Sequence, residues 1–380
     1  MWRPSASSAR RSTASGWCIT SSRAASPSCP AATAATCPST GSSRPAASSV
    51  ASPTAAPDTA PVFASAISVA DWPPPARLQA VSCGWLQRAG VELALLRLDL
   101  IDPLISGNKW YKLAPHLAEA RRRGAPGLIS LGGAHSNHLH ALAAAGARFG
   151  LATVGLLRGH EQKTPTVADL HRFGMQLHWL GYAGYRDRHR DDFWNPWRAL
   201  YPGFVPVAEG GLSLAAAQSC ATLVGEIERA LPGLGWTGYD QLWAAAGSGT
   251  TLAGLVMGEG GRHPLVGALA VPADHGVAPA LLRLLGEVGR PAEEGYRLLD
   301  ASRGGFARLD AELARFILDF EQATGVPLEP LYTGKLLLAL QEAVLSGEIA
   351  RGSRVVAVHS GGLQGRRALA SRLAELASQS

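Results

Sequence analysis

Lysine is scarce in this chain. Arginine carries nearly all of the positive charge, and lysine occurs only at Lys109, Lys112, Lys163 and Lys335. A guanidinium group does not lose its proton in proteins, whereas a lysine amine can, and only a free amine condenses with a carbonyl to form a Schiff base. Lys109 follows a Gly-Asn corner and precedes an amphipathic helix, so it is a candidate for such chemistry, with a plain surface lysine as the alternative. Lys112, one helical turn further on, is interpreted as a neighbour on the helix surface.

Cysteines are few and long apolar runs are missing. The five cysteines form no CxxC pair and show no metal-like spacing with histidine, and an odd number in a chain of 380 residues suggests reduced thiols in a cytoplasmic setting. No stretch of about eighteen apolar residues is free of charge or glycine, which argues against a membrane span. His135, His138 and His140 lack a further ligand at a suitable spacing, so we expect no metal site.

Positive charge exceeds negative charge but is not concentrated. The formal net charge is +6, and the one dense run, residues 121–123, stands at a predicted helix end, where arginines complement the helix dipole. No basic stripe with interleaved aromatic residues is present, so we expect no nucleic-acid partner.

Acidic residues are almost missing from the first 65 positions, where Asp58 is the single one. This region is rich in Ser, Ala, Pro, Thr and Arg and has no apolar periodicity, so it cannot bury enough surface to offset chain entropy. We interpret residues 1–70 as a disordered or spurious extension. An organellar targeting peptide has a similar composition and is the alternative.

From about residue 73 onward, apolar patterns alternate between the strand and the helix type. Strands are predicted at 91–98, 128–131, 151–157, 175–180, 204–207, 241–246, 265–271 and 355–358. Helices are predicted after Lys109 and at 137–147, 215–231, 250–257, 278–288, 309–323, 336–345 and 364–377. This alternation predicts an α/β fold with doubly wound, mostly parallel sheets.

Glycine clusters follow three of the predicted strands, at 132–133, 247–251 and 361–362. Ligands of such sheets bind at the carboxyl ends of strands, so these clusters mark the expected active face. Gly247-Ser248-Gly249-Thr250-Thr251 is typical of a phosphate cradle, because glycines let backbone amides converge at a helix start. A tight turn without a ligand is the alternative. The loop lacks both the GK[ST] ending of a nucleotide-binding loop and the spacing of G-x-G-x-x-G.

Polar side chains accompany these clusters. Ser136 and Asn137 open a predicted helix, where they either cap it or receive a substrate carboxylate. Tyr332 is predicted to lie at a strand end before a helix, and a structural tyrosine is the alternative. Ser360 ends the last buried strand.

Six motifs occur in one order: Gly-Asn-Lys, Gly-Gly-x-x-Ser-Asn, Glu-Gly-Gly, Gly-Ser-Gly-Thr-Thr, Tyr-Thr-Gly-Lys and His-Ser-Gly-Gly. Together they resemble the 1-aminocyclopropane-1-carboxylate deaminase / D-cysteine desulfhydrase family over residues 75–378. Its members are pyridoxal-phosphate enzymes with the tryptophan-synthase β-subunit fold (fold type II). The resemblance implies a large cofactor-binding domain of residues 71–111 and 226–380, and a small domain of residues 112–225. It also implies a homodimer.

The resemblance also implies roles for single residues. Lys109 would hold pyridoxal 5′-phosphate as a Schiff base and move the substrate's α-proton, and Tyr332 and Ser136 would be the other catalytic groups. The substrate, a small amino acid, would lie against Ser136, Asn137 and His138. The remaining cofactor contacts would come from Asn137, Gly247, Ser248, Gly249, Thr250, Thr251 and Ser360.

Two departures concern the reaction. Thr333 stands where the ring-opening deaminases of the family have Glu, and Ser360 stands where they tend to have an apolar residue. Hydroxyl groups leave the pyridine nitrogen of the cofactor largely unprotonated, which suffices for loss of a good leaving group such as thiolate. We therefore expect a β-eliminating lyase of the D-cysteine desulfhydrase type that forms a 2-oxo acid and ammonia. A 1-aminocyclopropane-1-carboxylate deaminase, and a racemase or cofactor-binding protein without elimination, are the alternatives.

A third departure concerns the substrate. His135 replaces the usual Gln, and Leu96-Arg97-Leu98-Asp99 replaces a more charged segment. Both are expected to approach the substrate side, so D-cysteine itself is not fixed as the substrate.

Overall fold

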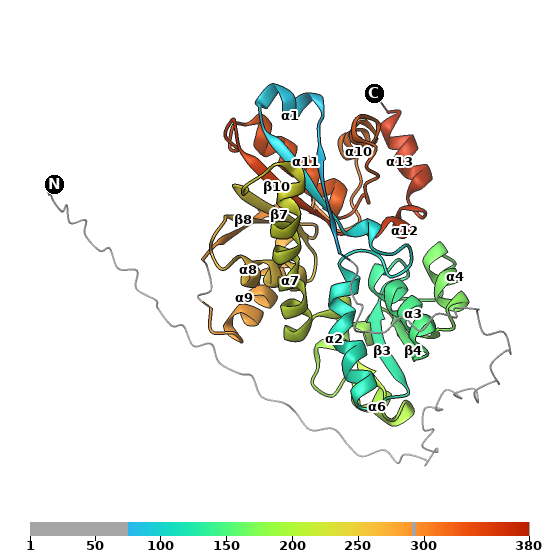
Figure 1. Cartoon of the computed structure of the whole chain (residues 1–380). Helices are drawn as coiled ribbons and strands as arrows, with labels where there is room; N and C mark the ends of the chain where they lie inside the picture. The colour runs from blue at the N-terminus through green and yellow to red at the C-terminus, as the bar shows by residue number, and fades with distance from the viewer. Residues whose placement is uncertain (1–74, 291–293, 380) are drawn as a thin grey trace, which may run out of the picture. The chain divides into compact units, whose positions relative to one another are not determined.

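The computed structural model describes residues 75–290 and 294–379, and the interpretation of residues 1–70 lies outside this described part. Strands and helices alternate along it (Figure 1), and the strands form two sheets. The α/β class with largely parallel sheets, predicted from the apolar patterns, is confirmed.

The larger sheet has six strands in the order β1-β2-β10-β7-β8-β9. Their bounds are β1 Arg77–Val81, β2 Glu92–Arg97, β7 Gln241–Ala246, β8 Leu265–Leu269, β9 Tyr296–Asp300 and β10 Arg354–His359. β1 runs antiparallel to β2, and the other neighbours are parallel. The ends of β2, β10 and β7 therefore lie side by side, which brings together residues from both ends of the described chain.

The smaller sheet has four parallel strands in the order β5-β4-β3-β6. Their bounds are β3 Gly127–Gly132, β4 Ala152–Leu157, β5 Gln176–Trp179 and β6 Val205–Pro206. All six residues of β3 are buried, as expected for a central parallel strand with both faces covered.

Helices cover both faces of the larger sheet (Figure 1). Side chains of β2 alternate between two apolar clusters: Leu93 and Leu95 face one, and Ala94 and Leu96 face the other. This alternation is what a strand with period two requires in a doubly wound sheet. The α-helices are α1 Gly84–Ala89, α2 Lys109–Arg122, α3 Asn137–Phe149, α4 Pro165–Arg172, α5 Gly181–Arg186, α6 Asn195–Leu200, α7 Leu214–Ala230, α8 Thr250–Glu259, α9 Val277–Gly286, α10 Ala311–Thr324, α11 Thr333–Leu345, α12 Leu363–Arg366 and α13 Ala370–Ala377.

Some predicted elements differ from the structure. The predicted closing helix at 364–377 is divided into α12 and α13. Tyr332 does not follow a strand, because residues 326–331, which include two prolines, form coil and turn before α11. The strands β1 and β9 and the helices α1, α4, α5 and α6 were not predicted. β1 and β9 are edge strands with exposed positions, so their apolar pattern is weak.

The strands of the smaller sheet all come from residues 112–225, the range predicted as a small domain, and those of the larger sheet come from outside it. The boundary at 225 falls within α7, which packs along α8. The domain limits themselves stay a prediction.

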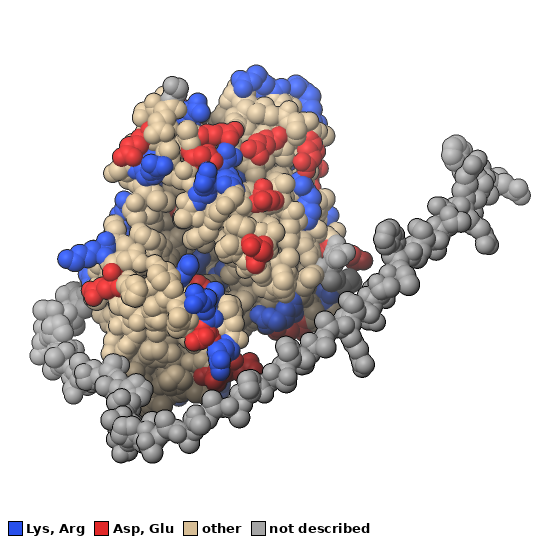
Figure 2. Space-filling model, turned by 180° about the vertical axis from the view of Figure 1, so that it is seen from behind, with Lys and Arg blue, Asp and Glu red and all other residues tan. Residues whose placement is uncertain are grey.

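Charged residues of both signs lie on one face of the molecule. On the face shown in Figure 2, basic and acidic side chains of the described residues are interspersed. No helix within the described ranges combines the length and the apolar character needed to cross a bilayer.

Candidate active site

Lys109 is the first residue of α2 and lies beside the carboxyl end of β10. Gly107 has φ +68°, and a Cβ there would lie 1.9 Å from the carbonyl oxygen of Ser360, so this corner requires glycine. The side chain of Asn108 joins two parts of the site: its Nδ2 donates to Thr251 Oγ1 at 2.9 Å, and its Oδ1 accepts from Lys109 Nζ at 2.8 Å. Burial, with a smaller contribution from Lys112, lowers the pKa of Lys109 to about 7. A free amine is therefore available near neutral pH.

The predicted phosphate cradle lies at the junction of β7 and α8. Gly249, with φ +77°, is the N-cap of α8, and Thr250 and Thr251 are buried in its first turn. Ser248 Oγ lies 3.0 Å from Thr250 Oγ1. Free backbone amides and hydroxyl groups thus gather at the positive end of a ten-residue helix, which is the arrangement that binds phosphate.

Lys112 belongs to this cradle, which corrects the interpretation of it as a surface residue. It is 5% exposed, and its Nζ lies 3.3 Å from Ser248 Oγ and 3.4 Å from the carbonyl oxygen of Gly210. Burial lowers its pKa. The scarcity of lysine, which drew attention to Lys109, applied equally to Lys112. Residues three apart in a helix share a face, so a lysine one turn after Lys109 points to the same site.

Ser136, Asn137 and His138 lie at the start of α3, after the end of β3. Ser136 is the N-cap, and its Oγ accepts from the backbone N–H of Leu139 at 3.2 Å. Asn137 Oδ1 accepts from Gln364 Nε2 at 3.0 Å, and a Cβ on Gly362 would lie 2.8 Å from Asn137 Nδ2. Asn137 therefore reaches the loop that follows β10. Ser360, at the start of this loop, contacts the corner before Lys109.

His138 is buried and faces inward. Ser130 Oγ donates to the carbonyl oxygen of Val207, so it accepts from His138 Nε2, 2.9 Å away. His138 Nδ1 is then an acceptor, and it is buried with no hydrogen-bond partner. Burial, followed by the charge of Lys109, holds the pKa of His138 well below its usual range. The side chain is a neutral imidazole, and its predicted contact with substrate stays a prediction.

Tyr332 is the N-cap residue of α11 and lies against the cradle. A Cβ on Gly247 would come within 2.8 Å of the Tyr332 ring, so the ring and the cradle are in direct contact. Burial and the nearby carboxyl groups of Glu329 and Glu209 raise the pKa of Tyr332. Thr333 Oγ1 accepts from the backbone N–H of Glu329 at 2.8 Å and donates to its carbonyl oxygen at 3.0 Å, so this hydroxyl is committed within the loop.

Glu329 is a buried carboxyl group that the six motifs do not include. It is 2% exposed and accepts from the backbone N–H groups of Leu331 and Tyr332 at 2.9 and 2.7 Å. Burial raises its pKa to about 7 against the opposing effect of these hydrogen bonds. A Cβ on Gly362 would lie 3.5 Å from its Cγ, so Glu329 and Asn137 meet at the same glycine.

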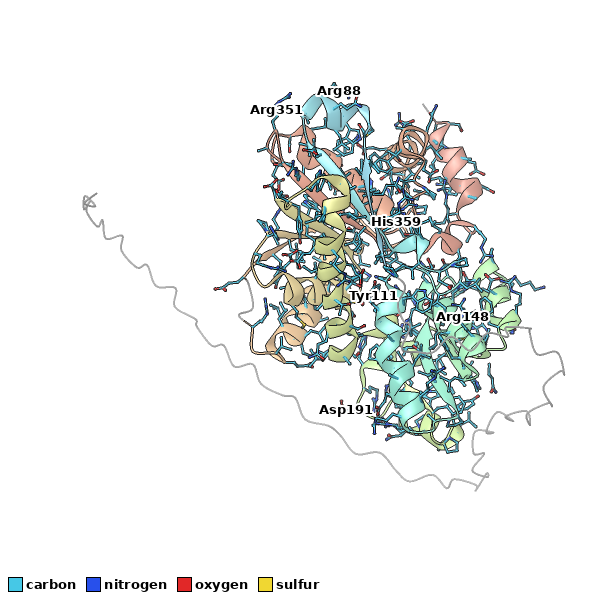
Figure 3. All side chains as sticks on the ribbon, viewed as in Figure 1. Arg88, Tyr111, Arg148, Asp191, Arg351 and His359 are labelled. Atoms are coloured by element: carbon cyan, nitrogen blue, oxygen red, sulfur yellow. The ribbon has the colours of Figure 1, made fainter. Side chains whose placement is uncertain are left out.

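Ser360 follows β10, and its carbonyl oxygen accepts from the backbone N–H of Asn108 at 3.1 Å. The preceding residue, His359 (Figure 3), donates from Nε2 to the carbonyl oxygen of Pro327 at 2.8 Å. Arg97 and Asp99 form a buried ion pair at 2.6 Å, and Asp99 Oδ1 lies 3.2 Å from His359 Nδ1. Asp99, which is paired with Arg97, thus contacts His359, the last residue of β10 and the neighbour of Ser360. His135, by contrast, is exposed.

The chain belongs to the family described as "Pyridoxal-phosphate dependent enzyme", whose model matches residues 70–361. D-cysteine desulfhydrase of Salmonella typhi is 28% identical over 300 residues, which cover 72% of this chain and 87% of that protein. The mitochondrial bifunctional D-cysteine desulfhydrase/1-aminocyclopropane-1-carboxylate deaminase of Arabidopsis thaliana is 27% identical over 299 residues, covering 73% of each. The pyridoxal-phosphate enzyme family implied by the six motifs is confirmed.

The fold has a solved counterpart. The crystal structure of an ACC deaminase homologue matches with a TM-score of 0.70 and 24% sequence identity, over 80% of this chain and 94% of that one. The predicted fold type II architecture is therefore confirmed.

The site fits pyridoxal phosphate, the cofactor of this family. An amine with a lowered pKa, Lys109, is linked through Asn108 to the hydroxyl groups of the cradle, and the second lysine, Lys112, stands at the cradle itself. The site thus combines an amine that can react with an aldehyde and a loop suited to an anion, and the side chain of Asn108 links the two. The individual roles predicted for the site residues stay predictions.

Proposed function

We propose that this protein eliminates a β-substituent from a small amino acid, with D-cysteine as the first candidate substrate, and releases a 2-oxo acid and ammonia. The observation that carries the proposal is the link from Lys109 through Asn108 to Thr251, with Tyr332 against the same cradle. The names of the relatives support a deaminating reaction with D-cysteine or 1-aminocyclopropane-1-carboxylate.

Different residues of the site would hold the cofactor and move the proton of the substrate. The amides at the start of α8, the hydroxyl groups of Ser248, Thr250 and Thr251, and Lys112 would hold the phosphate group of the cofactor, and Lys109 would hold its aldehyde carbon. Pyridoxal phosphate, when bound, supplies the electron sink for cleavage at the α-carbon. The Lys109 amine, with its pKa lowered to about 7, would take the α-proton of the substrate.

Two further groups complete the site. Tyr332, whose pKa is raised, keeps its hydroxyl proton near neutral pH and can donate a hydrogen bond to a departing thiolate. Ser136, at the positive end of α3, offers a hydroxyl and neighbouring backbone amides to the substrate carboxylate.

The preference for elimination over ring opening rests on Thr333 and Ser360. In place of a carboxylate, Thr333 offers a hydroxyl that is already committed to the backbone of Glu329. Ser360 remains the hydroxyl for the pyridine nitrogen, and a hydroxyl does not protonate that nitrogen as a carboxylate would. Loss of thiolate needs less stabilisation of the carbanion than opening a cyclopropane ring.

The first test concerns Lys109. Purified protein should show the visible absorption band of a pyridoxal-phosphate Schiff base, and Lys109→Ala should lose the band and at least about 10³-fold in kcat. Lys163→Ala, at an exposed position, is the matched control. An unchanged spectrum in Lys109→Ala would refute the assignment.

The reaction type is tested with a panel of D- and L-cysteine, D- and L-serine, chloroalanine and 1-aminocyclopropane-1-carboxylate, assayed for 2-oxo acid and ammonia. We expect the highest kcat/KM for D-cysteine. A higher value for 1-aminocyclopropane-1-carboxylate would favour the deaminase, and turnover without either product would favour a racemase.

A further inference from the structure

Lys335 is enclosed by backbone carbonyl groups. It is 1% exposed, and its Nζ lies 3.2 Å from the oxygen of Ala270, 2.9 Å from that of Ser302, and 2.8 Å from those of Gly305 and Phe306. A lysine ammonium has three donors and no acceptor, so four carbonyl groups exceed its hydrogen-bonding capacity. Several carbonyl oxygens converging on one positive charge is also how proteins replace the hydration shell of a monovalent cation.

The position of Lys335 is unfavourable for a lysine that served stability alone. It is in the first turn of α11, where the helix dipole disfavours a positive charge, and no acidic residue occupies that turn. Its ammonium group is also removed from water, which lowers its pKa to about 8. The surrounding carbonyl oxygens must compensate both costs.

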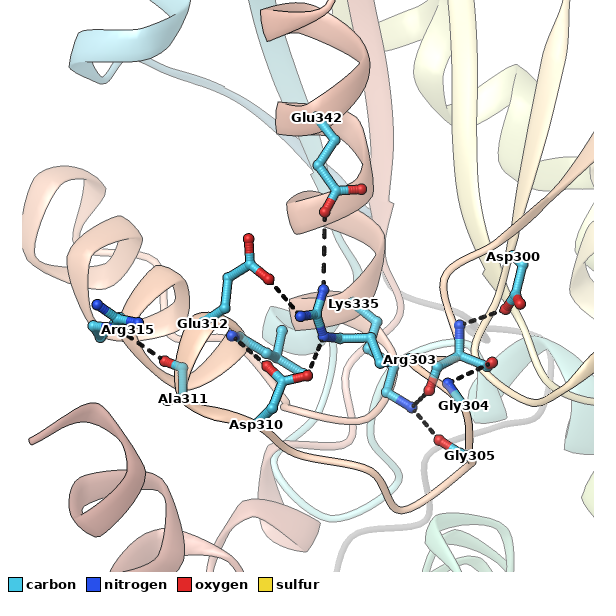
Figure 4. Close-up of polar contacts among 12 residues, drawn as sticks. Asp300, Arg303, Gly304, Gly305, Asp310, Ala311, Glu312, Arg315, Lys335 and Glu342 are labelled. Carbon is cyan, nitrogen blue, oxygen red and sulfur yellow. Dashed lines mark hydrogen bonds and ion pairs between the residues drawn. The ribbon is translucent and has the colours of Figure 1, made fainter. Parts of the chain in front are cut away.

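The segment that supplies three of these carbonyl groups, Ser302–Phe306, is held under strain. Arg303 has φ +56° and is the sole non-glycine residue with positive φ among those described. Its guanidinium group contacts Asp310 and Glu312 at 2.5 Å, while Lys335 approaches the same segment from α11 (Figure 4). Strained residues persist where surrounding contacts enforce them, and they often mark functional sites.

The segment ends at the candidate active site. The ring of Phe306 packs against that of Tyr332, with centroids 5.6 Å apart and planes inclined by 62°. Tyr332 directly contacts the cradle at Gly247. The carbonyl cage therefore connects, through Phe306, to a residue expected to act in the reaction.

We propose that Lys335 is a positioning residue whose ammonium group serves as a built-in monovalent cation. It gathers the segments that follow β8 and β9 onto the start of α11 and thereby fixes Phe306 against Tyr332. The role of Tyr332 rests on the proposed function, whereas the cage does not.

The test removes the ammonium group and supplies a free cation. Lys335→Ala is prepared in tetramethylammonium chloride and then in potassium chloride of equal ionic strength. In tetramethylammonium we expect the unfolding midpoint of the cofactor-free protein to fall by several degrees and kcat to fall about 10- to 100-fold, because a misplaced catalytic group costs this much. Potassium, which fits among carbonyl oxygens, should restore part of the unfolding midpoint and part of kcat. The wild type and Lys163→Ala should respond equally to the two salts.

Two further variants separate a cation site from plain packing. Lys335→Arg should have neither the unfolding midpoint nor the kcat of the wild type, because a planar guanidinium cannot replace a compact ammonium in the cage. Phe306→Leu alters a side chain that is 39% exposed, so the fold should be kept. It should lower kcat without changing KM or the cofactor absorption band, and potassium should not restore it. The double variant Lys335→Ala/Phe306→Leu in tetramethylammonium should lose no more kcat than the worse single variant.

Lys335→Ala with wild-type midpoint and kcat in tetramethylammonium, or with no gain of either in potassium, overturns the cation role. Phe306→Leu with wild-type kcat overturns the positioning role, and does so even if Lys335→Ala fails to fold. The midpoint readout needs no substrate. If no amino acid of the panel is converted, the proposed function fails while a potassium-dependent midpoint still establishes the cage.

Discussion

Glu329 is a carboxyl group whose ordinary chemistry is changed by burial. Burial raises its pKa from 4.5 to about 7, while the amides of Leu331 and Tyr332 and the charges of Lys335 and Lys109 oppose the rise. Its carboxyl group can therefore be neutral or ionised near neutral pH. Because it holds the backbone of Tyr332, its protonation state affects a residue of the candidate site.

This pKa predicts a pH dependence of stability in the cofactor-free protein. Between pH 4.5 and about 7 the folded state binds the Glu329 proton and the unfolded state does not, so this contribution to the free energy of unfolding falls as the pH rises. Glu329→Gln should remove that fall and give a flatter profile, measured as the denaturant unfolding free energy at each pH. The exposed Glu161→Gln should keep the wild-type slope. An equally steep profile in Glu329→Gln would contradict the prediction.

At the scale of elements, the first turn of α2 explains why two lysines with lowered pKa values lie at one site. Lys109 and Lys112 are three residues apart and share a helix face, and Lys112 contributes to the lowered pKa of Lys109. One helix start thus supplies both the reactive amine and a positive charge at the cradle.

Lys112→Met keeps the length of the side chain and removes this charge. A hydrogen bond to a charged group contributes about 1.5–3 kcal/mol, so we expect the cofactor-free variant to bind pyridoxal phosphate about 10- to 100-fold more weakly. Titration of the visible absorption band measures this affinity. Lys163→Met serves as the control, and an unchanged affinity in Lys112→Met would show that the cradle does not use this lysine.

At the scale of the whole molecule, the family match begins at residue 70 and the first described strand at Arg77. A chain that begins at Ala70 should therefore have the unfolding midpoint, cofactor absorption and kcat/KM of the full chain. A lower midpoint or activity would assign residues 1–69 a part in folding or catalysis. The expected homodimer and cytoplasmic location stay predictions at this scale.

Much of the fold could be predicted because its signals are local. The buried strands β3, β7 and β10 read as short apolar runs, and the glycine clusters mark their ends. The edge strands β1 and β9 were missed because exposed positions interrupt their apolar pattern.

The sequence by itself determined the α/β class, the family motifs and the candidacy of Lys109, since each depends on residues close together in the chain. The tertiary structure alone decided which distant residues meet. Asn108 bonds to Thr251, 143 positions away, because the sheet order places the ends of β10 and β7 side by side. The buried position of Lys112 and the carbonyl cage of Lys335 likewise depend on loops from separate strands. Such contacts leave no periodic trace in the sequence, because they join residues that lie far apart in the chain.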